Sequence, residues 1–208
     1  MTLELTPQEG EFLVGLARKA VEVFLGTGRM LRPPKNSPTK LQQRHGVFVT
    51  INSVKKGARV LRGCIGYPFQ TTILVQAVVE CAISSATQDP RFLPVTLKEL
   101  DHLIFEVSVL TPPEPIEVET LKMLPSRIKI GRDGIIVEKD AFKGLLLPQV
   151  PVENQWEAQE FLSHGCMKAG LTPDCWLLKE TKIMKFQCII ASEVMPEGAV
   201  VIRGPNLI

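Results

Sequence analysis

Apolar residues recur at the spacing of one helix face in three segments of the chain, and this pattern predicts three helices. The first begins with a capping box at Thr6 and is ended by Gly26 and Gly28. The second covers residues 71–85, from a threonine cap at its first or second residue. Apolar residues occur on all of its faces, so we expect it to be largely buried. The third covers residues 154–170.

Between these helices, apolar and polar residues alternate over short segments, as is typical of strands. Asp133-Gly134 stands between two apolar runs and predicts a two-residue hairpin. The other expected strands or extended segments are residues 47–52, 58–61, 104–111, 144–150 and 185–194. Because strands follow one another in hairpin-like pairs with few helices between them, the pattern predicts an α+β fold with mainly antiparallel sheets flanked by helices. Prolines 112, 113 and 115 mark a candidate domain boundary.

The composition is that of a globular protein. The chain has 208 residues, of which 45% are hydrophobic and 22% are charged. No apolar run reaches the roughly 20 residues that a membrane-spanning helix needs. The first residues do not resemble a signal peptide, so we expect a cytoplasmic protein without a membrane partner. Five cysteines without a C-x-x-C pair indicate reduced thiols rather than a disulfide framework.

Charge is distributed unevenly along the chain. No acidic residue occurs between Glu22 and Glu80, and all 22 acidic residues lie outside this stretch. The same stretch contains nine basic residues: Arg29, Arg32, Lys35, Lys40, Arg44, Lys55, Lys56, Arg59 and Arg62. Residues 29–45 also contain three prolines and are expected to form a long irregular loop. A stretch of this kind would attract anions.

Leu61-Arg62-Gly63-Cys64-Ile65-Gly66 stands near the centre of this basic stretch. We expect it to form a strand-to-helix turn in which Gly63 and Gly66 bracket the cysteine. The adjacent Arg62 and a helix N-terminus a few residues downstream would lower the pKa of Cys64 and make it more nucleophilic. The alternative is a small buried cysteine in a tight turn.

The usual motifs of nucleotide-binding loops, zinc proteases and serine hydrolases are absent from the sequence. His164, Cys166 and Cys175 match no usual zinc spacing, so we predict no metal site, and core packing explains Cys166 better. Whether the protein uses a cofactor is unknown from the sequence.

The hexapeptide 61–66 resembles the signature of the AMMECR family. Further stretches that resemble the family are Gly46–Thr50, Asp89–Phe92, Ser108–Thr111, Gly144–Val150 with Trp156, and Cys166–Leu171. The resemblance covers residues 45–180 and implies a cytoplasmic protein of two α+β subdomains with the hexapeptide near a cleft between them. We expect the larger subdomain to contain residues 1–112 and 180–208 and the smaller to contain 113–179. Family members occur beside, or fused to, Memo-like and radical-SAM proteins, but the resemblance implies no substrate.

Three functions remain open. In the first, an enzyme or small-ligand-binding protein uses Cys64 as a nucleophile or covalent carrier on an anionic substrate such as a nucleotide. The base would be His45, the histidine nearest in sequence, or alternatively His164. The expected substrate-binding residues are Arg62, Gly63, Gly66, Asp89 and Arg91. For Asp89 and Arg91, an ordinary loop salt bridge is the alternative.

The second function is a nucleic-acid-binding or regulatory module that contacts phosphates through the basic residues of 29–62. The scarcity of aromatic residues, with two Trp and one Tyr, argues against it. The third is an interaction module for Memo-like or radical-SAM proteins, which rests on the resemblance alone.

Overall fold

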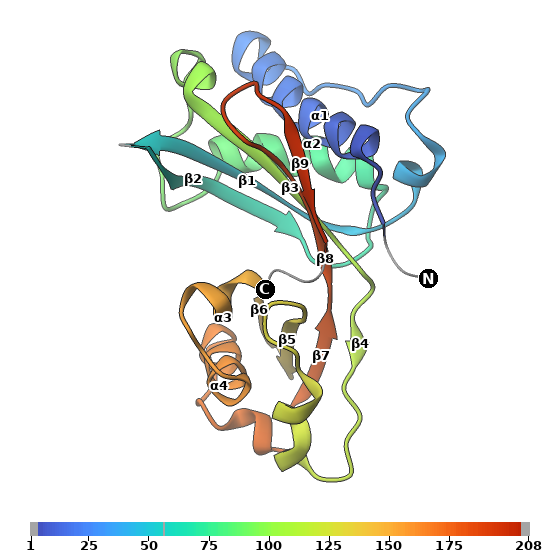
Figure 1. Ribbon diagram of the computed structural model, residues 1–208, viewed down its shortest axis with the longest axis vertical. Helices are drawn as coiled ribbons and strands as arrows, with labels where there is room; N and C mark the ends of the chain where they lie inside the picture. The colour runs from blue at the N-terminus through green and yellow to red at the C-terminus, as the bar shows by residue number, and fades with distance from the viewer. Residues whose placement is uncertain (1–3, 56, 205–208) are drawn as a thin grey trace. The chain divides into compact units, whose positions relative to one another are not determined.

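The computed structural model describes residues 4–55 and 57–204, which fall into two compact units. Unit 1 contains the chain as far as Leu110 together with Ile189–Arg203, and unit 2 contains Thr111–Cys188. Each unit has helices and one antiparallel sheet, so the predicted α+β class is confirmed (Figure 1). Residues 180–188, which we expected in the larger subdomain, belong to unit 2. The predicted cleft between the subdomains stays a prediction.

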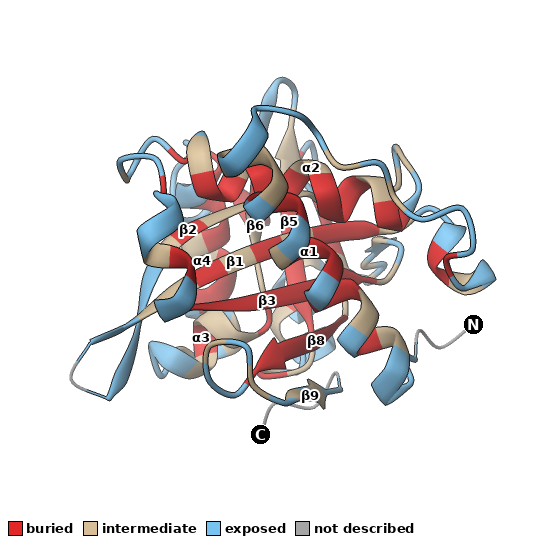
Figure 2. Cartoon of the chain, turned by 90° about the horizontal axis from the view of Figure 1, so that it is seen from above, coloured by how far each residue is buried: buried red, intermediate tan, exposed pale blue. Residues whose placement is uncertain are grey.

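Unit 1 contains a five-stranded sheet in the order β2-β1-β3-β8-β9. Its strands are β1 (Gly46–Lys55), β2 (Ala58–Tyr67), β3 (Leu103–Leu110), β8 (Cys188–Glu193) and β9 (Val200–Arg203). Two long helices, α1 (Pro7–Thr27) and α2 (Leu74–Thr87), cover one face of this sheet (Figures 1 and 2). Two short 3-10 helices complete the unit, η1 (Thr39–Gln42) and η2 (Leu97–His102).

The core of unit 1 lies between the helices and this sheet face, where Figure 2 shows buried residues on both sides. Val47, Val49 and Ile51 of β1 are fully buried in it. Because successive side chains of a strand point to opposite faces, Thr50 points to the other face of the sheet. We call that other face the distal face.

The first helix agrees with its prediction. Thr6 caps α1 through a capping box with Glu9, and Gly28 ends it with a φ of 70°. Glycine adopts this left-handed conformation without steric cost. Helix α2 is largely buried, as predicted, but it begins later than expected. Its N-cap is Ile73, which makes no side-chain capping bond.

Unit 2 contains a four-stranded sheet in the order β4-β7-β5-β6. Its strands are β4 (Glu114–Pro115), β5 (Gly134–Lys139), β6 (Phe142–Leu146) and β7 (Lys182–Phe186). Its helices are α3 (Gln149–Glu153), α4 (Ala158–Lys168) and the 3-10 helices η3 (Leu121–Arg127) and η4 (Cys175–Leu177). A second apolar core forms around Phe161 and Leu162 of α4 and Ile135 and Val137 of β5.

Two strand predictions are wrong. Asp133-Gly134 does not form a hairpin, because the Asp133 side chain instead accepts a hydrogen bond from the Lys129 N–H and no strand directly precedes it. The hairpin is β5–β6, which turns at Asp140 with a positive φ of 54°. The single strand expected over 185–194 is two strands, separated at Gln187.

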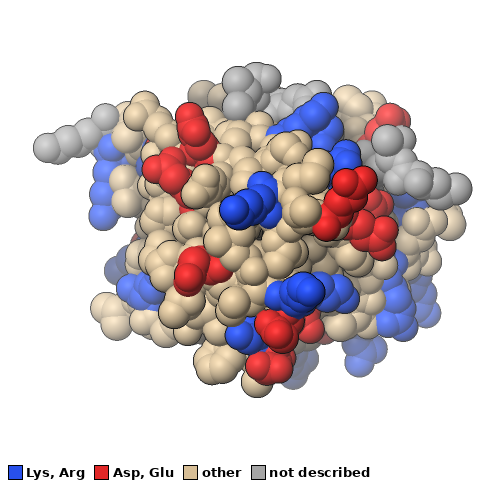
Figure 3. Space-filling view, turned by 90° about the horizontal axis from the view of Figure 1, so that it is seen from below, with Lys and Arg blue, Asp and Glu red and all other residues tan. Residues whose placement is uncertain are grey.

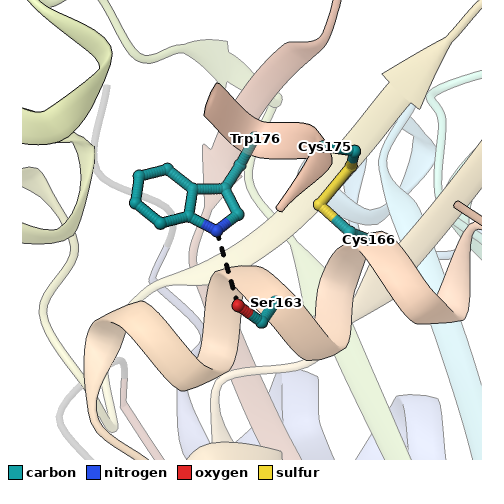
Figure 4. Close-up of a disulfide and its surroundings, with 4 residues drawn as sticks. All are labelled: Ser163, Cys166, Cys175 and Trp176. Atoms are coloured by element: carbon teal, nitrogen blue, oxygen red, sulfur yellow. Dashed lines mark hydrogen bonds between the residues drawn. A yellow bond between two sulfur atoms is a disulfide. The ribbon is translucent and has the colours of Figure 1, made fainter. Parts of the chain in front are cut away.

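The prediction of five reduced cysteines is also wrong, because Cys166 and Cys175 form a disulfide. It joins the C-terminal part of α4 to η4, and Trp176 beside it donates a hydrogen bond to Ser163 on α4 (Figure 4). Both cysteines are buried in the core of unit 2. The pair could not be predicted from the sequence, because the two cysteines are nine positions apart and do not have the C-x-x-C spacing.

Candidate functional site

The hexapeptide is not a strand-to-helix turn. All six of its residues belong to strand β2, which continues to Tyr67, and the next helix begins only at Leu74. The expectation that a helix N-terminus lies close to Cys64 therefore has no support. The candidate site instead lies on a strand at the edge of the unit 1 sheet.

Arg62 is the additional residue of a β-bulge. Ile51 pairs with Gly63 and Asn52 pairs with Leu61, so Arg62 has no partner on β1. A bulge re-aims the side chain of its extra residue. The guanidinium of Arg62 donates to the carboxylate of Glu99 at 2.9 Å and to the backbone carbonyls of Leu93 and Pro94. These bonds engage Arg62 within the protein, so the structure does not present it as an anion-binding group.

Gly63 and Gly66 are required by close packing and not by a turn. A Cβ at Gly63 would overlap the backbone carbonyl oxygen of Ser85 on α2, and neither group can move without displacing its element. A Cβ at Gly66 would overlap the ring of Phe48 and the carbonyl of Val47 on β1. The two glycines thus let β2 approach α2 on one face and Phe48 on the other.

Ser85 of α2 enters the ladder between β1 and β2. Val49 and Ile65 are partners in this ladder, but the Ser85 hydroxyl lies between them. It donates to the Val49 carbonyl and accepts from the Ile65 N–H, both at 2.8 Å. Gly63 permits this insertion because the Ser85 backbone lies directly against it. The hexapeptide is therefore anchored to α2 as well as to β1.

Asp89 and Arg91 occupy the free edge of β2. The Cys64 N–H donates to the Asp89 carboxylate at 2.8 Å, and the Cys64 carbonyl accepts from Arg91 at 3.3 Å. The two side chains also form a salt bridge at 2.6 Å, and the Arg91 hydrogen bonds hold the pKa of Asp89 at about 2. They therefore satisfy the edge groups that a neighbouring strand would otherwise bind.

Three side chains form a row across the distal face. Cys64 pairs with Thr50, and Thr50 pairs with Glu106 on β3. Residues directly opposite in antiparallel strands share a face, so the row runs from thiol to hydroxyl to carboxylate. The Thr50 hydroxyl donates to Cys64 Sγ at 3.3 Å. Arg203 of β9 forms a salt bridge with Glu106 at 2.9 Å.

The expected decrease in the pKa of Cys64 is wrong. Burial of the thiol raises its pKa, and the carboxylates of Asp89 and Glu106 raise it further. The Thr50 hydrogen bond and the charge of Arg91 act in the opposite direction but do not outweigh burial. Cys64 is therefore a neutral thiol at neutral pH.

His45 does not lie beside Cys64. It precedes β1, and five residues separate it from Thr50, the partner of Cys64. At about 3.3 Å per residue this is roughly 16 Å along the strand. Burial lowers the pKa of His45, and its Nδ1 atom has no hydrogen-bond partner within the described part of the chain. The structure thus brings Asp89 and Arg91 to Cys64 but not His45.

The sequence pattern did not indicate that Thr50, Ser85, Glu106 and Arg203 belong to the site. In the structure only 12% of the Glu106 side chain is exposed, which makes an ordinary solvated position untenable. The alternation of β1 and β3 contained the signal, because it places Thr50 and Glu106 on one face. What it lacked was the strand pairing that puts them beside Cys64.

The basic stretch does not present all nine charges to solvent as free groups. Lys40 forms a salt bridge with Glu9, Arg62 binds Glu99, and Arg44 donates to the backbone carbonyl of Thr71. These three contacts reduce the support for a nucleic-acid-binding surface. On the face in Figure 3, basic and acidic side chains are interspersed among uncharged residues.

No group of three or more metal-ligating side chains occurs among the described residues. The disulfide removes the thiolates of Cys166 and Cys175 as zinc ligands. No helix in the described ranges is long and apolar enough to span a membrane.

The sequence profile of the AMMECR1 family matches residues 14–191. The protein PH0010 of Pyrococcus horikoshii is 51% identical over 201 residues, which cover 96% of this chain and 97% of that protein. A Methanothermobacter thermautotrophicus protein is 52% identical over 189 residues, or 91% of this chain and 96% of the relative. The crystal structure of PH0010, described as an uncharacterized protein, matches with a TM-score of 0.88 at 52% identity and covers 94% of this chain and 96% of that one.

Proposed function

This chain belongs to the AMMECR1 family, and we propose that it is an enzyme that acts on small anionic molecules with the thiol of Cys64 as its reactive group. One observation supports this most strongly. Among the free cysteines, Cys64 is the one with a partly accessible side chain, whereas Cys81 and Cys188 are buried. The Thr50 hydroxyl orients its sulfur, and Asp89 and Arg91 fix its backbone.

Each neighbour of Cys64 has a separate role in this proposal. When Sγ forms a bond to an electrophilic carbon, the thiol proton passes to solvent water, and the Thr50 hydroxyl, which donates to Sγ, stabilises the thiolate that forms. Glu106 lies in the same row and its charge raises the thiol pKa, so it opposes ionisation and does not take the role that the sequence suggested for His45. The raised pKa keeps the thiol neutral until a substrate is in place.

Arg91 is the proposed contact for the anionic group of the substrate. Its side chain is 53% exposed, and its Nε and one terminal nitrogen bind Asp89 and the Cys64 carbonyl. The second terminal nitrogen, Nη1, donates to no residue of the described ranges, so it can donate to a ligand. Arg62 is not assigned this role, because its bonds to Glu99 and two carbonyls engage it.

We also propose that this activity takes place in the cytoplasm, because the reaction requires a reduced Cys64. The Cys166–Cys175 disulfide does not oppose this location. Relatives of the chain come from Pyrococcus and Thermococcus, and intracellular proteins of hyperthermophilic archaea are often rich in disulfides.

Competing alkylation tests the proposal directly. Iodoacetate and iodoacetamide both form a bond from Sγ to carbon and release iodide, but only iodoacetate is an anion. We expect both reagents to modify Cys64 before Cys81 and Cys188, which mass spectrometry of peptides would show. The Arg91→Gln variant should lower the ratio of iodoacetate to iodoacetamide rates at Cys64 by about twofold to fivefold, the size of an exposed charge contact.

The Arg91→Lys variant is the matched control, because it keeps the charge but loses the forked geometry. It should retain most of the wild-type rate ratio. The ratio cancels general changes in accessibility, which would alter both rates equally. A Cys64 that neither reagent modifies in the folded protein, or a ratio unchanged in Arg91→Gln, would argue against the proposal.

A further inference from the structure

Unit 1 has a hollow of about 480 Å³ at the hairpin end of its distal face. Val54 lies four residues along β1 from Thr50, and it pairs with Arg59 on β2, so both residues share the distal face. The hollow is lined by the apolar residues Val54, Ile104, Val194 and Met195 and by the polar residues Arg59 and His102. Cys64 does not line it, and four residues of strand correspond to about 13 Å.

Arg59 is a cation held only by neutral acceptors. Its guanidinium donates to the Ser192 hydroxyl at 2.8 Å and to the backbone carbonyls of Glu193 and Val194. No carboxylate of a described residue lies within salt-bridge distance of it. Five other arginines do form such pairs, namely Arg18, Arg62, Arg91, Arg132 and Arg203. A fixed guanidinium without a counter-ion at the wall of a hollow favours an anion there.

The rest of the wall is apolar and remains accessible. Three of the apolar wall residues are exposed, namely Val54 at 43%, Val194 at 48% and Met195 at 59%. Covering them would remove apolar surface from water, which stabilises a bound apolar group. His102, at the end of η2, supplies a second polar side chain beside Arg59. A hollow of this size is in the range of small-molecule sites.

We infer that this hollow binds an amphipathic organic anion. A carboxylate or phosphate head binds at Arg59 and His102, and an apolar body lies against Val54, Val194 and Met195. The site is separate from Cys64 and does not depend on the function proposed for it. Carboxylate and phosphate share the chemistry that Arg59 recognises, so the experiment must distinguish them.

Titration with straight-chain alkyl carboxylates and alkyl phosphates tests this site. The protein would be labelled with ¹³C at its methionine methyl groups and followed by NMR. We expect the Met195 resonance, identified by its loss in Met195→Leu, to shift on binding. Met123 and Met167 belong to unit 2 and do not line the hollow, so their resonances should stay in place.

The dependence of the affinity on alkyl chain length and on the Arg59 side chain defines the class of ligand. Each added methylene group should tighten binding about fourfold, because burial of one CH₂ contributes about 0.8 kcal/mol. The Arg59→Gln variant should weaken binding about tenfold, as expected for a lost charge-assisted hydrogen bond. Arg32→Gln removes the same charge from an exposed loop residue and should leave the affinity unchanged. The head group that binds more tightly at equal chain length identifies the anion.

Several outcomes would overturn the inference. Inorganic phosphate that binds as tightly as the alkyl compounds would show an anion site without an apolar part. An Arg59→Gln variant that binds as the wild type does would show an apolar surface without anion recognition. If Arg59→Gln does not fold, Met195→Ala replaces an exposed side chain and should reduce the chain-length dependence. An unchanged dependence there, or a Met195 resonance that does not move, also contradicts the site.

Discussion

Cys64 in unit 1 and the Cys166–Cys175 pair in unit 2 show how neighbours decide what a cysteine does. Cys64 has polar groups around it: a hydroxyl on its sulfur, a carboxylate on its N–H and a guanidinium on its carbonyl. Cys166 and Cys175 are 0% and 1% exposed within an apolar core and are bonded to each other. One region therefore keeps a thiol available, whereas the other uses its sulfurs as a covalent link.

The two regions are also held together differently. Around Cys64, noncovalent contacts from β1, α2 and the segment after α2 fix one strand. In unit 2, one disulfide joins α4 to η4. Close packing of this kind is disrupted when a single atom is added. A disulfide stabilises the fold mainly by restricting the conformations of the unfolded chain. Substitutions at the two places therefore separate these two mechanisms.

The largest expected effect is that of Gly63→Ala. The new Cβ would overlap the Ser85 carbonyl, so β2 and α2 would have to separate. We expect a loss of about 4 kcal/mol or more in the free energy of unfolding, measured by chemical denaturation. Gly15→Ala is the control, because its Cβ would meet nothing within 4 Å on helix α1. It should stabilise the protein by about 0.5–1 kcal/mol. A Gly63→Ala variant as stable as the wild type would refute the packing role.

The second effect concerns the disulfide. The double variant Cys166→Ala/Cys175→Ala should lose about 2.5 kcal/mol of unfolding free energy, because the bond closes a short loop of the chain. Urea denaturation with and without a reductant provides the comparison. The wild type should lose a similar amount in reductant, while the double variant should not respond to it. A wild type that is indifferent to reductant after full reduction would contradict the assigned link.

The third effect is the dependence of the Asp89–Arg91 pair on pH. The folded-state pKa of Asp89 is about 2, below its ordinary value of 3.8. A depressed pKa contributes stability that is fully present above the ordinary value and is lost as pH falls toward the folded-state value. For Asp89 this contribution to the free energy of unfolding is about 2 kcal/mol.

The Asp89→Asn variant lacks this contribution. The difference in unfolding free energy between it and the wild type should therefore shrink as pH falls from 5 to about 2. Glu138→Gln is the control, because it removes a half-exposed carboxylate whose pKa is also lowered, by Lys143. Its effect should be much smaller, since exposed ion pairs contribute little. A difference that stays constant over this pH range would contradict a paired, buried Asp89.

The elements that could be predicted from sequence are those with local signals. The capping box at Thr6 and the glycine at position 28 define α1 because their contacts lie within a few residues. The alternation of 47–52 and 104–111 predicted β1 and β3 for the same reason. The Asp133-Gly134 signal failed because the buried Asp133 carboxylate instead accepts from the Lys129 N–H and pairs with Arg132.

The site could be predicted only in part, because its contacts are distant along the chain. The hexapeptide itself was evident, and Asp89 and Arg91 do contact Cys64. The positions of Thr50 and Glu106 depend on strand pairing over 14 and 56 residues. The pKa of Cys64 was predicted in the wrong direction because local positive charge is visible in a sequence, whereas burial is not.

The smallest expected effect concerns the Cys64 thiol alone, so it tests most directly how polar neighbours control this cysteine. Thr50→Val removes the hydrogen bond that lowers the thiol pKa, so the pKa should rise further. Glu106→Gln removes a charge that raises it, so the pKa should fall. Only the thiolate reacts with iodoacetamide, so at neutral pH the rate at Cys64 should decrease in Thr50→Val and increase in Glu106→Gln. Each change should be about threefold to tenfold, the contribution of one polar contact. Both replacements nearly preserve side-chain shape, so opposite changes report charge and hydrogen bonding. If both rates moved in the same direction, accessibility and not the row of polar groups would control the thiol.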